Sequence, residues 1–268
     1  MKAAVVFDLQ QGPVWSDFSD PRAGESEALV KVRAAAISHV VKGRASGKHY
    51  SFDGRLPFVP GIDGAGVLPD GRRVYFAFPA APWGSMAQWA PVALNHCLPR
   101  PDELDDITAA PMANPGKSAW AALVKPEADA IVNLSQEEAS LRAQFAELAA
   151  QQIDGVVDYL WGRSAELLLP ALAKHSPGNT PVRFIQVGSL SAADIALSGA
   201  VLRSAPLQLM GSGIGSLSVS QLLAATGEML QAAVTGGFTI ATTPRPLREV
   251  AAAWPQDNSQ KRTVFIVA

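Results

Sequence analysis

The sequence holds a single cysteine, Cys97, among its 268 residues, and this excludes an intramolecular disulfide. The chain has only four histidines, and none of them stands in the Cys/His spacing of a structural zinc site. Because disulfide-rich domains belong to oxidising compartments, we expect a reducing, cytoplasmic location for this chain.

Charge is also scarce, since charged residues make up 17% of the chain and the formal net charge is −2. No polybasic tract occurs, so the composition gives no support to nucleic-acid binding. The apolar run from Ala3 to Phe7 is far shorter than a signal-peptide core or the roughly 20 residues of a membrane helix. The hydrophobic share of 48% suits a packed globular protein of one large or two smaller domains.

The first hundred residues predict a β domain, because short apolar or alternating runs are separated by Gly and Pro. Three glycines between Gly61 and Gly66 indicate a strand that another backbone approaches closely. Asp70-Gly71 predicts the turn into a hairpin partner of that strand. The other expected strands are Val5–Phe7, Leu29–Ala35, Val74–Phe78 and Met86–Pro91.

From Pro101 onward, apolar runs alternate with helical patterns, which is typical of a parallel sheet built from βαβ units. The expected strands are Ala130–Leu134, Val156–Trp161, Phe184–Gly188 and Leu207–Met210. The expected helices are 102–110, 116–124, 136–151 and 164–174, then a long one that begins after Ser216 or Ser218 and ends at Gly236-Gly237. A short helix over 246–254 and a terminal strand over 263–267 complete the pattern.

Five motifs follow one another along the chain: Pro60–Gly66 (PGIDGAG), Gly71–Val74 (GRRV), Gly84–Trp89 (GSMAQW), Asn114–Trp120 (NPGKSAW) and Arg183–Gly188 (RFIQVG). In this order they resemble the medium-chain dehydrogenase/reductase superfamily, and most of all its zinc-independent quinone oxidoreductase branch. The resemblance implies an α/β plus β fold. A GroES-like β-barrel substrate domain would span 1–122 with 241–268, and an abbreviated Rossmann-like parallel-sheet domain would span 123–240.

The zinc ligands of the superfamily are missing from the matching positions. Zinc-dependent members place a Cys near Ser38 or His39 and a His-Glu pair after Pro60-Gly61, where this chain has Ile62-Asp63. A catalytic zinc needs three protein ligands around an open position. We therefore expect a zinc-independent protein without a bound metal.

The nucleotide-binding part also departs from the family pattern. A Rossmann domain holds the pyrophosphate at a Gly-rich turn and a helix N-terminus, which should follow Val124. Instead the chain runs into Lys125–Leu134, which resembles the third strand of the family, so about one and a half βα units are expected to be absent. Gly211–Ser216 (GSGIGS) misses the G-x-G-x-x-G motif at its last position. It is either a capped turn or a substitute phosphate site.

Two functions remain open at this stage. The resemblance implies an oxidoreductase that uses NADPH to transfer a hydride to a quinone or an enone, a small-molecule substrate. The missing nucleotide loop favours the alternative, a non-catalytic derivative, truncated naturally or by engineering, that acts as a binding or dimerisation module.

Candidate catalytic residues are Ser38, Lys42 and Tyr50, which the resemblance places where polar side chains orient a substrate carbonyl. A solvated helix face is the alternative for Lys42 and is also expected for Arg44, and a surface or structural role is the expectation for His39 and His49. The cofactor-side candidates lie in the helix entering the Rossmann domain or at strand ends, where doubly wound folds bind ligands; they are Lys117, Trp161, Gly188, Ser189, Gly211 and Gly213.

Self-association is the last expectation. Members of the family often dimerise through the edge of the Rossmann sheet, here near Leu207–Met210, so the resemblance implies a homodimer. The missing strands would expose a second edge, at Ala130–Leu134 or Val156–Leu160. Either a second copy or the helix over 136–151 would then cover it.

Overall fold

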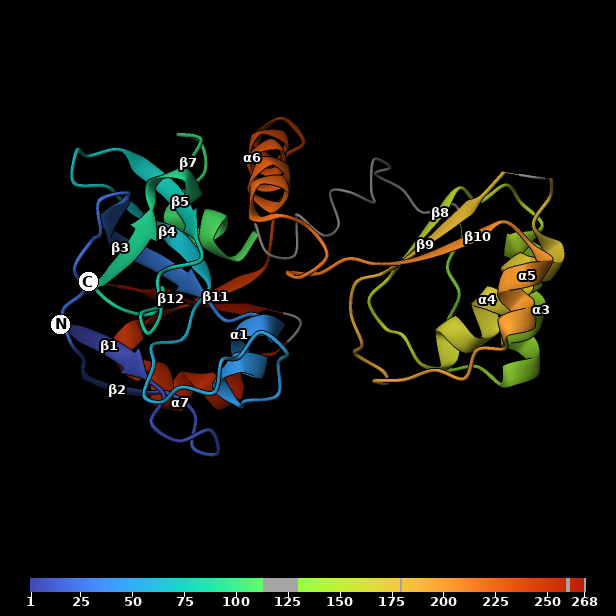
Figure 1. The fold of residues 1–268 in the computed structure, drawn as a ribbon, viewed down its shortest axis with the longest axis horizontal. Helices are drawn as coiled ribbons and strands as arrows, with labels where there is room; N and C mark the ends of the chain where they lie inside the picture. Colours follow the sequence, from blue (N-terminus) through green and yellow to red (C-terminus); the bar gives the residue numbers. More distant parts are fainter. Residues whose placement is uncertain (113–129, 179, 259–260, 268) are drawn as a thin grey trace. The chain divides into compact units, whose positions relative to one another are not determined.

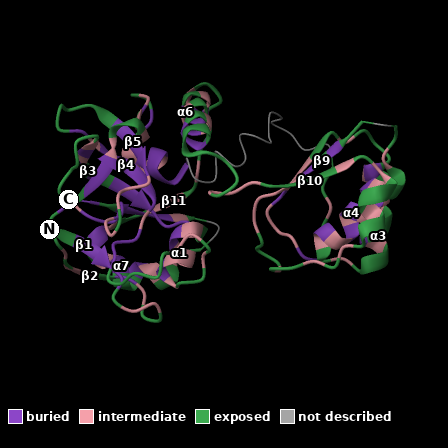
Figure 2. Cartoon of the chain, in the orientation of Figure 1, coloured by how far each residue is buried: buried purple, intermediate pink, exposed green. Residues whose placement is uncertain are grey.

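The computed structural model describes residues 1–112, 130–178, 180–258 and 261–267 (Figure 1). The chain divides into two compact units, of which unit 1 comprises Met1–Lys117 with Val219–Ala268 and unit 2 comprises Ser118–Ser218. Buried residues gather inside each unit, so each has a core of its own (Figure 2). The domain limits expected from the sequence, 1–122 with 241–268 and 123–240, stay a prediction.

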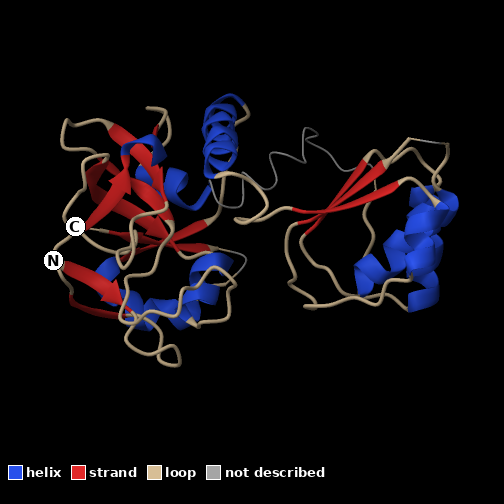
Figure 3. Cartoon of the chain, in the orientation of Figure 1, coloured by secondary structure: helices blue, strands red, loops and turns tan. Residues whose placement is uncertain are grey.

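A seven-stranded sheet forms the centre of unit 1, with the strand order β11-β12-β3-β4-β5-β7 and with β6 paired to β3 (Figure 3). All its pairs are antiparallel except β11 with β12. The terminal strand β12 therefore returns to the N-terminal sheet, as the sequence predicts. The strands are β3 (Glu27–Ala36), β4 (Asp63–Val67), β5 (Arg73–Ala77), β6 (Trp89–Ala93), β7 (Cys97–Pro99), β11 (Thr242–Pro246) and β12 (Arg262–Ile266).

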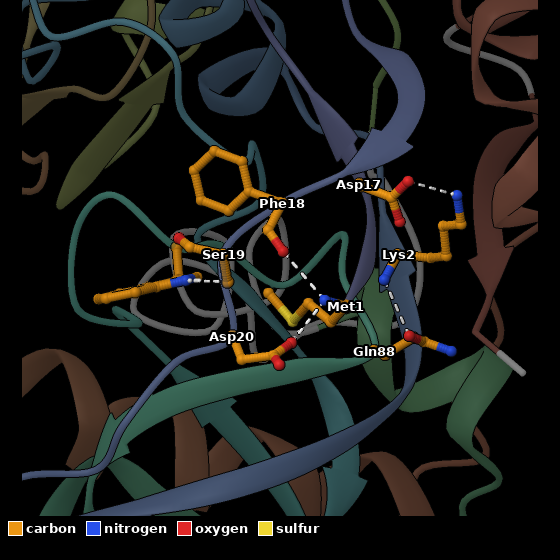
Figure 4. A network of polar contacts seen from close by, with 8 residues as sticks. Met1, Lys2, Asp17, Phe18, Ser19, Asp20 and Gln88 are labelled. Atoms are coloured by element: carbon orange, nitrogen blue, oxygen red, sulfur yellow. Dashed lines mark hydrogen bonds and ion pairs between the residues drawn. The ribbon is translucent and has the colours of Figure 1, made fainter.

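A separate two-stranded ribbon joins β1 (Lys2–Val5) to β2 (Val14–Asp17). Figure 4 shows the polar contacts at its start, where the Lys2 ammonium pairs with Asp17 Oδ2 at 2.9 Å and the Lys2 amide donates to Gln88 Oε1 at 2.9 Å. Among the described residues no sheet closes on itself. The expected GroES-like closed barrel is therefore not confirmed as such.

The glycine-rich strand and its hairpin match the prediction. Strand β4 pairs with β5 from Asp63 opposite Ala77 to Val67 opposite Arg73, and Gly71 makes the turn with a φ of 89°. A Cβ atom on Gly64 would lie 2.7 Å from the carbonyl oxygen of Ala34. The β3 backbone passes so close to β4 that only glycine fits there.

Three of the helices expected from the sequence are present in unit 1, and α1 is an additional one. Residues 106–112 are helical, within and just beyond the expected 102–110. The long helix α6 ends just before Gly236-Gly237, and Gly237 has a φ of 60°, as expected for glycines after a helix C-terminus. The other bounds are α1 (His39–Ala45), α6 (Val219–Thr235) and α7 (Val250–Ala253), the last flanked by 3-10 turns at Leu247–Glu249 and Trp254–Gln256.

Unit 2 contains a parallel sheet with the order β10-β9-β8. Of the four strands expected in this part of the chain, the last three are confirmed as β8, β9 and β10. The helices expected over 136–151 and 164–174 are confirmed as α3 and α4. Leu141 and Phe145 of α3 share a core cluster with Leu169 and Leu172 of α4 and with Phe184 of β9. The elements are α3 (Glu138–Ala149), β8 (Gly155–Asp158), α4 (Arg163–His175), β9 (Val182–Gln186), α5 (Gly199–Ser204) and β10 (Leu207–Gly211).

The expected strand over Ala130–Leu134 is wrong. Residues 130–133 have no regular structure and Leu134 lies in a turn, where Asn133 Oδ1 accepts the amide of Ser135 at 3.0 Å. Ile131 is 88% exposed, so this apolar run has no strand partner in the described part of the chain, and the Asn side chain favours a turn before α3. The expected helix over 116–124, the motif at 114–120 and the Val124-Lys125 junction lie outside the described residues.

Candidate functional site

A cavity of about 340 Å³ lies within unit 1. Its volume is at the lower end of the range of small-molecule sites. Three chain segments form it: one face of α1, the loop before β4, and the loop after β5. The lining residues are Val41, Arg44, Asp53, Arg55, Leu56, Pro57, Phe58, Val59, Pro60, Gly61, Ile62, Phe78, Pro79, Ala81, Pro82 and Trp83.

Backbone hydrogen bonds hold two of these segments together. The Phe78 amide donates to the Ile62 carbonyl at 2.7 Å, and the Val59 amide donates to the Pro82 carbonyl at 2.9 Å. The Ser85 amide reaches the Gly61 carbonyl at 3.1 Å. Because paired backbone groups are costly to separate, this wall of the cavity is preformed.

The cavity is apolar except for three charged side chains. Val41, Phe58 and Ile62 are buried and supply the apolar wall. Asp53 and Arg55 are exposed and lie 3.9 Å apart, Arg55 Nε to Asp53 Oδ2.

Arg44 is the half-buried charge of the cavity. Its Nε is buried and has no hydrogen-bond partner among the described residues. Burial lowers the pKa of Arg44, although the nearby Asp53 carboxylate opposes that effect. An N–H donor that is removed from water and left without a partner is unfavourable. The cavity can hold an apolar molecule, and the Arg44 guanidinium is a cationic group in its lining.

The three predicted catalytic residues do not line this cavity. Ser38 is buried, and its Oγ accepts the Val41 amide at 3.2 Å as the N-cap of α1. Lys42 forms an ion pair with Asp257, Nζ to Oδ2 at 2.8 Å. Tyr50 is 70% exposed. Catalytic roles for these three residues stay predictions.

His49 sits beside these candidates and makes local contacts. Its ring stacks on that of Tyr50 at 4.3 Å, and its Nδ1 lies 2.8 Å from Ser51 Oγ. Burial, and then the charge of Arg44, lower the pKa of His49. These contacts agree with the structural role that the sequence favours for this histidine.

The cofactor-side candidates gather at one edge of unit 2. Trp161 follows β8, Gly188 and Ser189 follow β9, and Gly211 and Gly213 end or follow β10. Because the three strands are parallel, their carboxyl ends share an edge of the sheet. Lys117, the remaining candidate, lies outside the described residues.

Three backbone amides near the carboxyl ends of these strands have partners within the chain. Asp158 Oδ1 accepts the amides of Leu160 at 2.9 Å and Trp161 at 3.0 Å, and the Gly213 amide donates to Ser216 Oγ at 2.7 Å. A pyrophosphate needs free N–H donors at a helix N-terminus. The amides of Leu160, Trp161 and Gly213 are therefore not available to that group.

Trp161 also makes contacts that suit a core residue. Its ring lies edge-on to Phe184, with the centroids 6.4 Å apart, and it packs against the core cluster of unit 2. This is the alternative that the sequence left open for an aromatic side chain at a strand end.

Metal-ligating side chains are not clustered in the described part of the chain, where no group of three His, Cys, Asp or Glu could hold an ion. Asp63 accepts the Tyr75 hydroxyl at 2.7 Å. Cys97 Sγ donates to the Ala93 carbonyl at 3.7 Å, and burial raises the pKa of its thiol to about 11.

Sequence reasoning did not find the cavity or the half-buried Arg44. The lining comes from segments that are distant in sequence and are joined by backbone hydrogen bonds. No periodic pattern or motif indicates such a juxtaposition. The paired Pro and aromatic residues at Pro57-Phe58 and Pro82-Trp83 are the one available signal of a rigid wall.

No family model matches the chain. The "Probable NADPH-dependent quinone reductase tdiC" of Emericella nidulans is 24% identical over 347 aligned positions, which cover 95% of this chain and 96% of the relative. A mycobacterial quinone oxidoreductase has a TM-score of 0.78 at 15% identity, with 99% of both chains covered. The quinone oxidoreductase of Thermus thermophilus has a TM-score of 0.72 at 20% identity, covering 99% of this chain and 100% of that one. The chain thus has the fold of quinone oxidoreductases of known structure.

Proposed function

We propose that the chain is a quinone oxidoreductase-like protein, and that its reaction is the NADPH-dependent reduction of a quinone or an enone. The observation that carries the proposal is the likeness over almost the whole chain to solved quinone oxidoreductases. The name of the fungal relative, an NADPH-dependent quinone reductase, supports the same reaction.

The substrate side of the proposal rests on the cavity of unit 1. Its apolar wall suits a ring compound, and Arg44 is a donor for a carbonyl oxygen. We propose that residues 1–122 with 241–268 form the substrate domain and that 123–240 form the abbreviated nucleotide domain. Ser38, Lys42 and Tyr50 remain the predicted catalytic residues, and we propose a homodimer without a bound metal.

A second function is favoured by the cofactor side. The amides of Trp161 and Gly213 are used inside the chain, so these two N–H groups are not available to a pyrophosphate. The alignment with the fungal relative has 347 positions, more than the 268 residues of this chain, so the relative has residues without a counterpart here. These observations support a non-catalytic derivative that binds small molecules or dimerises.

Titration with NADPH distinguishes the two functions. A ligand at about 100 times its dissociation constant stabilises a folded protein by about 2.7 kcal/mol, so NADPH should raise the melting temperature of a reductase by several degrees. Consumption of NADPH with a simple naphthoquinone would then be followed by absorbance. A thermal shift together with quinone-dependent NADPH oxidation supports the reductase.

The opposite result is equally informative. If NADPH neither shifts the melting temperature nor is consumed, the reductase proposal fails and the binding module remains. NADH serves as the matched control nucleotide, because it lacks only the 2′-phosphate. An equal response to both nucleotides would contradict the NADPH preference while leaving the reductase in place.

A further inference from the structure

Arg44 brings a guanidinium group to the lining of the cavity. Its Nε is buried without a hydrogen-bond partner among the described residues. Such a guanidinium is satisfied best by an anionic oxygen, because a charge-assisted hydrogen bond is stronger than a neutral one.

The charges of the other lining residues point the same way. Asp53 and Arg55 are paired with each other at the exposed rim, at a distance of 3.9 Å. The charges of Asp53 and Arg55 cancel, so the lining keeps one net positive charge, that of Arg44. A ligand with a single negative charge complements this lining, whereas a nucleotide with several phosphates would not be neutralised.

The apolar part of the lining is fixed. Phe58 and Ile62 are buried, and the two loops are held together by backbone hydrogen bonds from Phe78 to Ile62 and from Val59 to Pro82. Packing against a preformed apolar wall favours rings over flexible chains, because a rigid ligand loses less conformational entropy on binding.

We propose that this cavity binds an aromatic or quinoid molecule that carries one acidic group, with the rings against the Phe58 and Ile62 wall and the carboxylate or sulfonate on Arg44. The inference deepens the proposed function, since it names the class of quinone that the chain would take. Its binding test needs no NADPH, so the two proposals can fail separately.

Calorimetric titration with 2-naphthoate and with 2-naphthamide tests the proposal. The two probes have nearly the same shape and differ in charge. We expect the wild-type protein to bind 2-naphthoate about tenfold or more tightly than 2-naphthamide, because a hydrogen bond to a charged group adds about 1.5–3 kcal/mol. Similar affinities, or no binding of either probe, would overturn the proposal.

Two substitutions locate the charge. Arg44→Met keeps an apolar stem of similar length, so it should weaken 2-naphthoate binding about tenfold or more and leave 2-naphthamide binding within about twofold. Arg33→Met makes the same chemical change at an exposed position of β3, outside the cavity lining, and should change either affinity less than about threefold. Equal losses in the two variants would contradict a specific role for Arg44.

A third variant covers the case in which Arg44→Met fails to fold, which circular dichroism would reveal. Arg44→Lys keeps the charge and the stem but replaces the planar fork with a point charge. It should retain the preference for 2-naphthoate over 2-naphthamide while weakening 2-naphthoate binding. Loss of binding of both probes together would instead mean that the cavity itself had collapsed, and the proposal would fall.

Discussion

The Tyr75 hydroxyl donates to Asp63 Oδ2 at 2.7 Å between the two strands of the β4–β5 hairpin. Both residues are buried, at 1% and 2% exposure. Burial, and then the negative charge of Asp63, raise the pKa of Tyr75 well above its ordinary value. This buried pair thus contributes to the folding of the hairpin.

Tyr75→Phe removes the donor from Asp63 and should lower the free energy of unfolding by about 1–3 kcal/mol, because a buried acceptor loses a partner. Urea unfolding measures the change. Tyr50→Phe is the matched control, since Tyr50 is 70% exposed and its hydroxyl should matter less. Equal stability of Tyr75→Phe and the wild type would show that the contact contributes nothing net.

The same pair gives a pH dependence. Folding raises the pKa of Tyr75, so the protonated phenol is favoured by the folded state, and its contribution is complete below pH about 10. As pH rises beyond that value, the unfolded chain loses the proton first and the stability falls. The free energy of unfolding, measured between about pH 9 and about pH 11, should therefore decline more steeply with pH for the wild type than for Tyr75→Phe.

Lys42 joins α1 to the segment before β12. Its Nζ lies 2.8 Å from Asp257 Oδ2, and Asp257 Oδ1 accepts the Thr263 amide at 2.9 Å. Lys42→Met should lower the free energy of unfolding by about 1 kcal/mol, because it leaves a largely buried carboxylate with one partner fewer. Lys48→Met, at an exposed lysine just after α1, is the control. Unchanged stability with lost quinone reduction would instead give Lys42 its predicted catalytic role.

The hairpin and the cavity show what a sequence does and does not reveal. The β4–β5 hairpin could be predicted because the glycines and the Asp70-Gly71 turn act within a short stretch of chain. The cavity could not be predicted, because its shape depends on contacts between α1 and two distant loops.

The wrong strand has a related cause. Ala130–Leu134 is apolar enough for a strand, but its local composition says nothing about whether a neighbouring strand pairs with it.

For Ser38 the sequence did contain a signal, since a serine before a helix is a common N-cap. The family resemblance drew attention to its catalytic position instead.

Gly64→Ala should be strongly destabilising. The added Cβ would lie 2.7 Å from the Ala34 carbonyl oxygen, a backbone atom that moves only if β3 and β4 separate. We expect a loss of about 2 kcal/mol or more in the free energy of unfolding, measured with urea. Gly211→Ala is the matched strand control, because a Cβ there meets nothing within 4 Å. A loss as large in the control would contradict the steric explanation.

Cys97 should react slowly with thiol reagents. Burial raises the pKa of its thiol to about 11, so roughly one molecule in a thousand carries the reactive thiolate at pH 8. Release of thionitrobenzoate from Ellman's reagent should be slow for the folded protein and fast in urea, where the same thiol is exposed. Because folding favours the protonated thiol, its contribution to the stability of the folded state is complete below pH about 9 and is lost as the pH rises toward 11. Rapid reaction of the folded protein would contradict it.

The predicted homodimer can be tested at β10. This strand lies at one edge of the three-stranded sheet of unit 2, and Leu209 on it is 38% exposed. If two copies join along this edge, Leu209→Lys should convert the dimer to a monomer, because it puts a charge into the buried contact. Ile131→Lys is the control, because Ile131 lies outside any strand, in the segment before α3.

Light scattering of the three proteins at high concentration distinguishes the edges. Ile131 is 88% exposed and lies outside any strand, so a lysine there should leave a β10 dimer intact. A dimer that survives Leu209→Lys and dissociates with Ile131→Lys would place the contact at the segment before α3 instead. A wild-type monomer would rule out both contacts. Cover of the β8 edge by the helix expected over 136–151, observed as α3, would then be the hypothesis to test, since Leu141 and Phe145 of α3 share a core cluster against which Val156 of β8 packs.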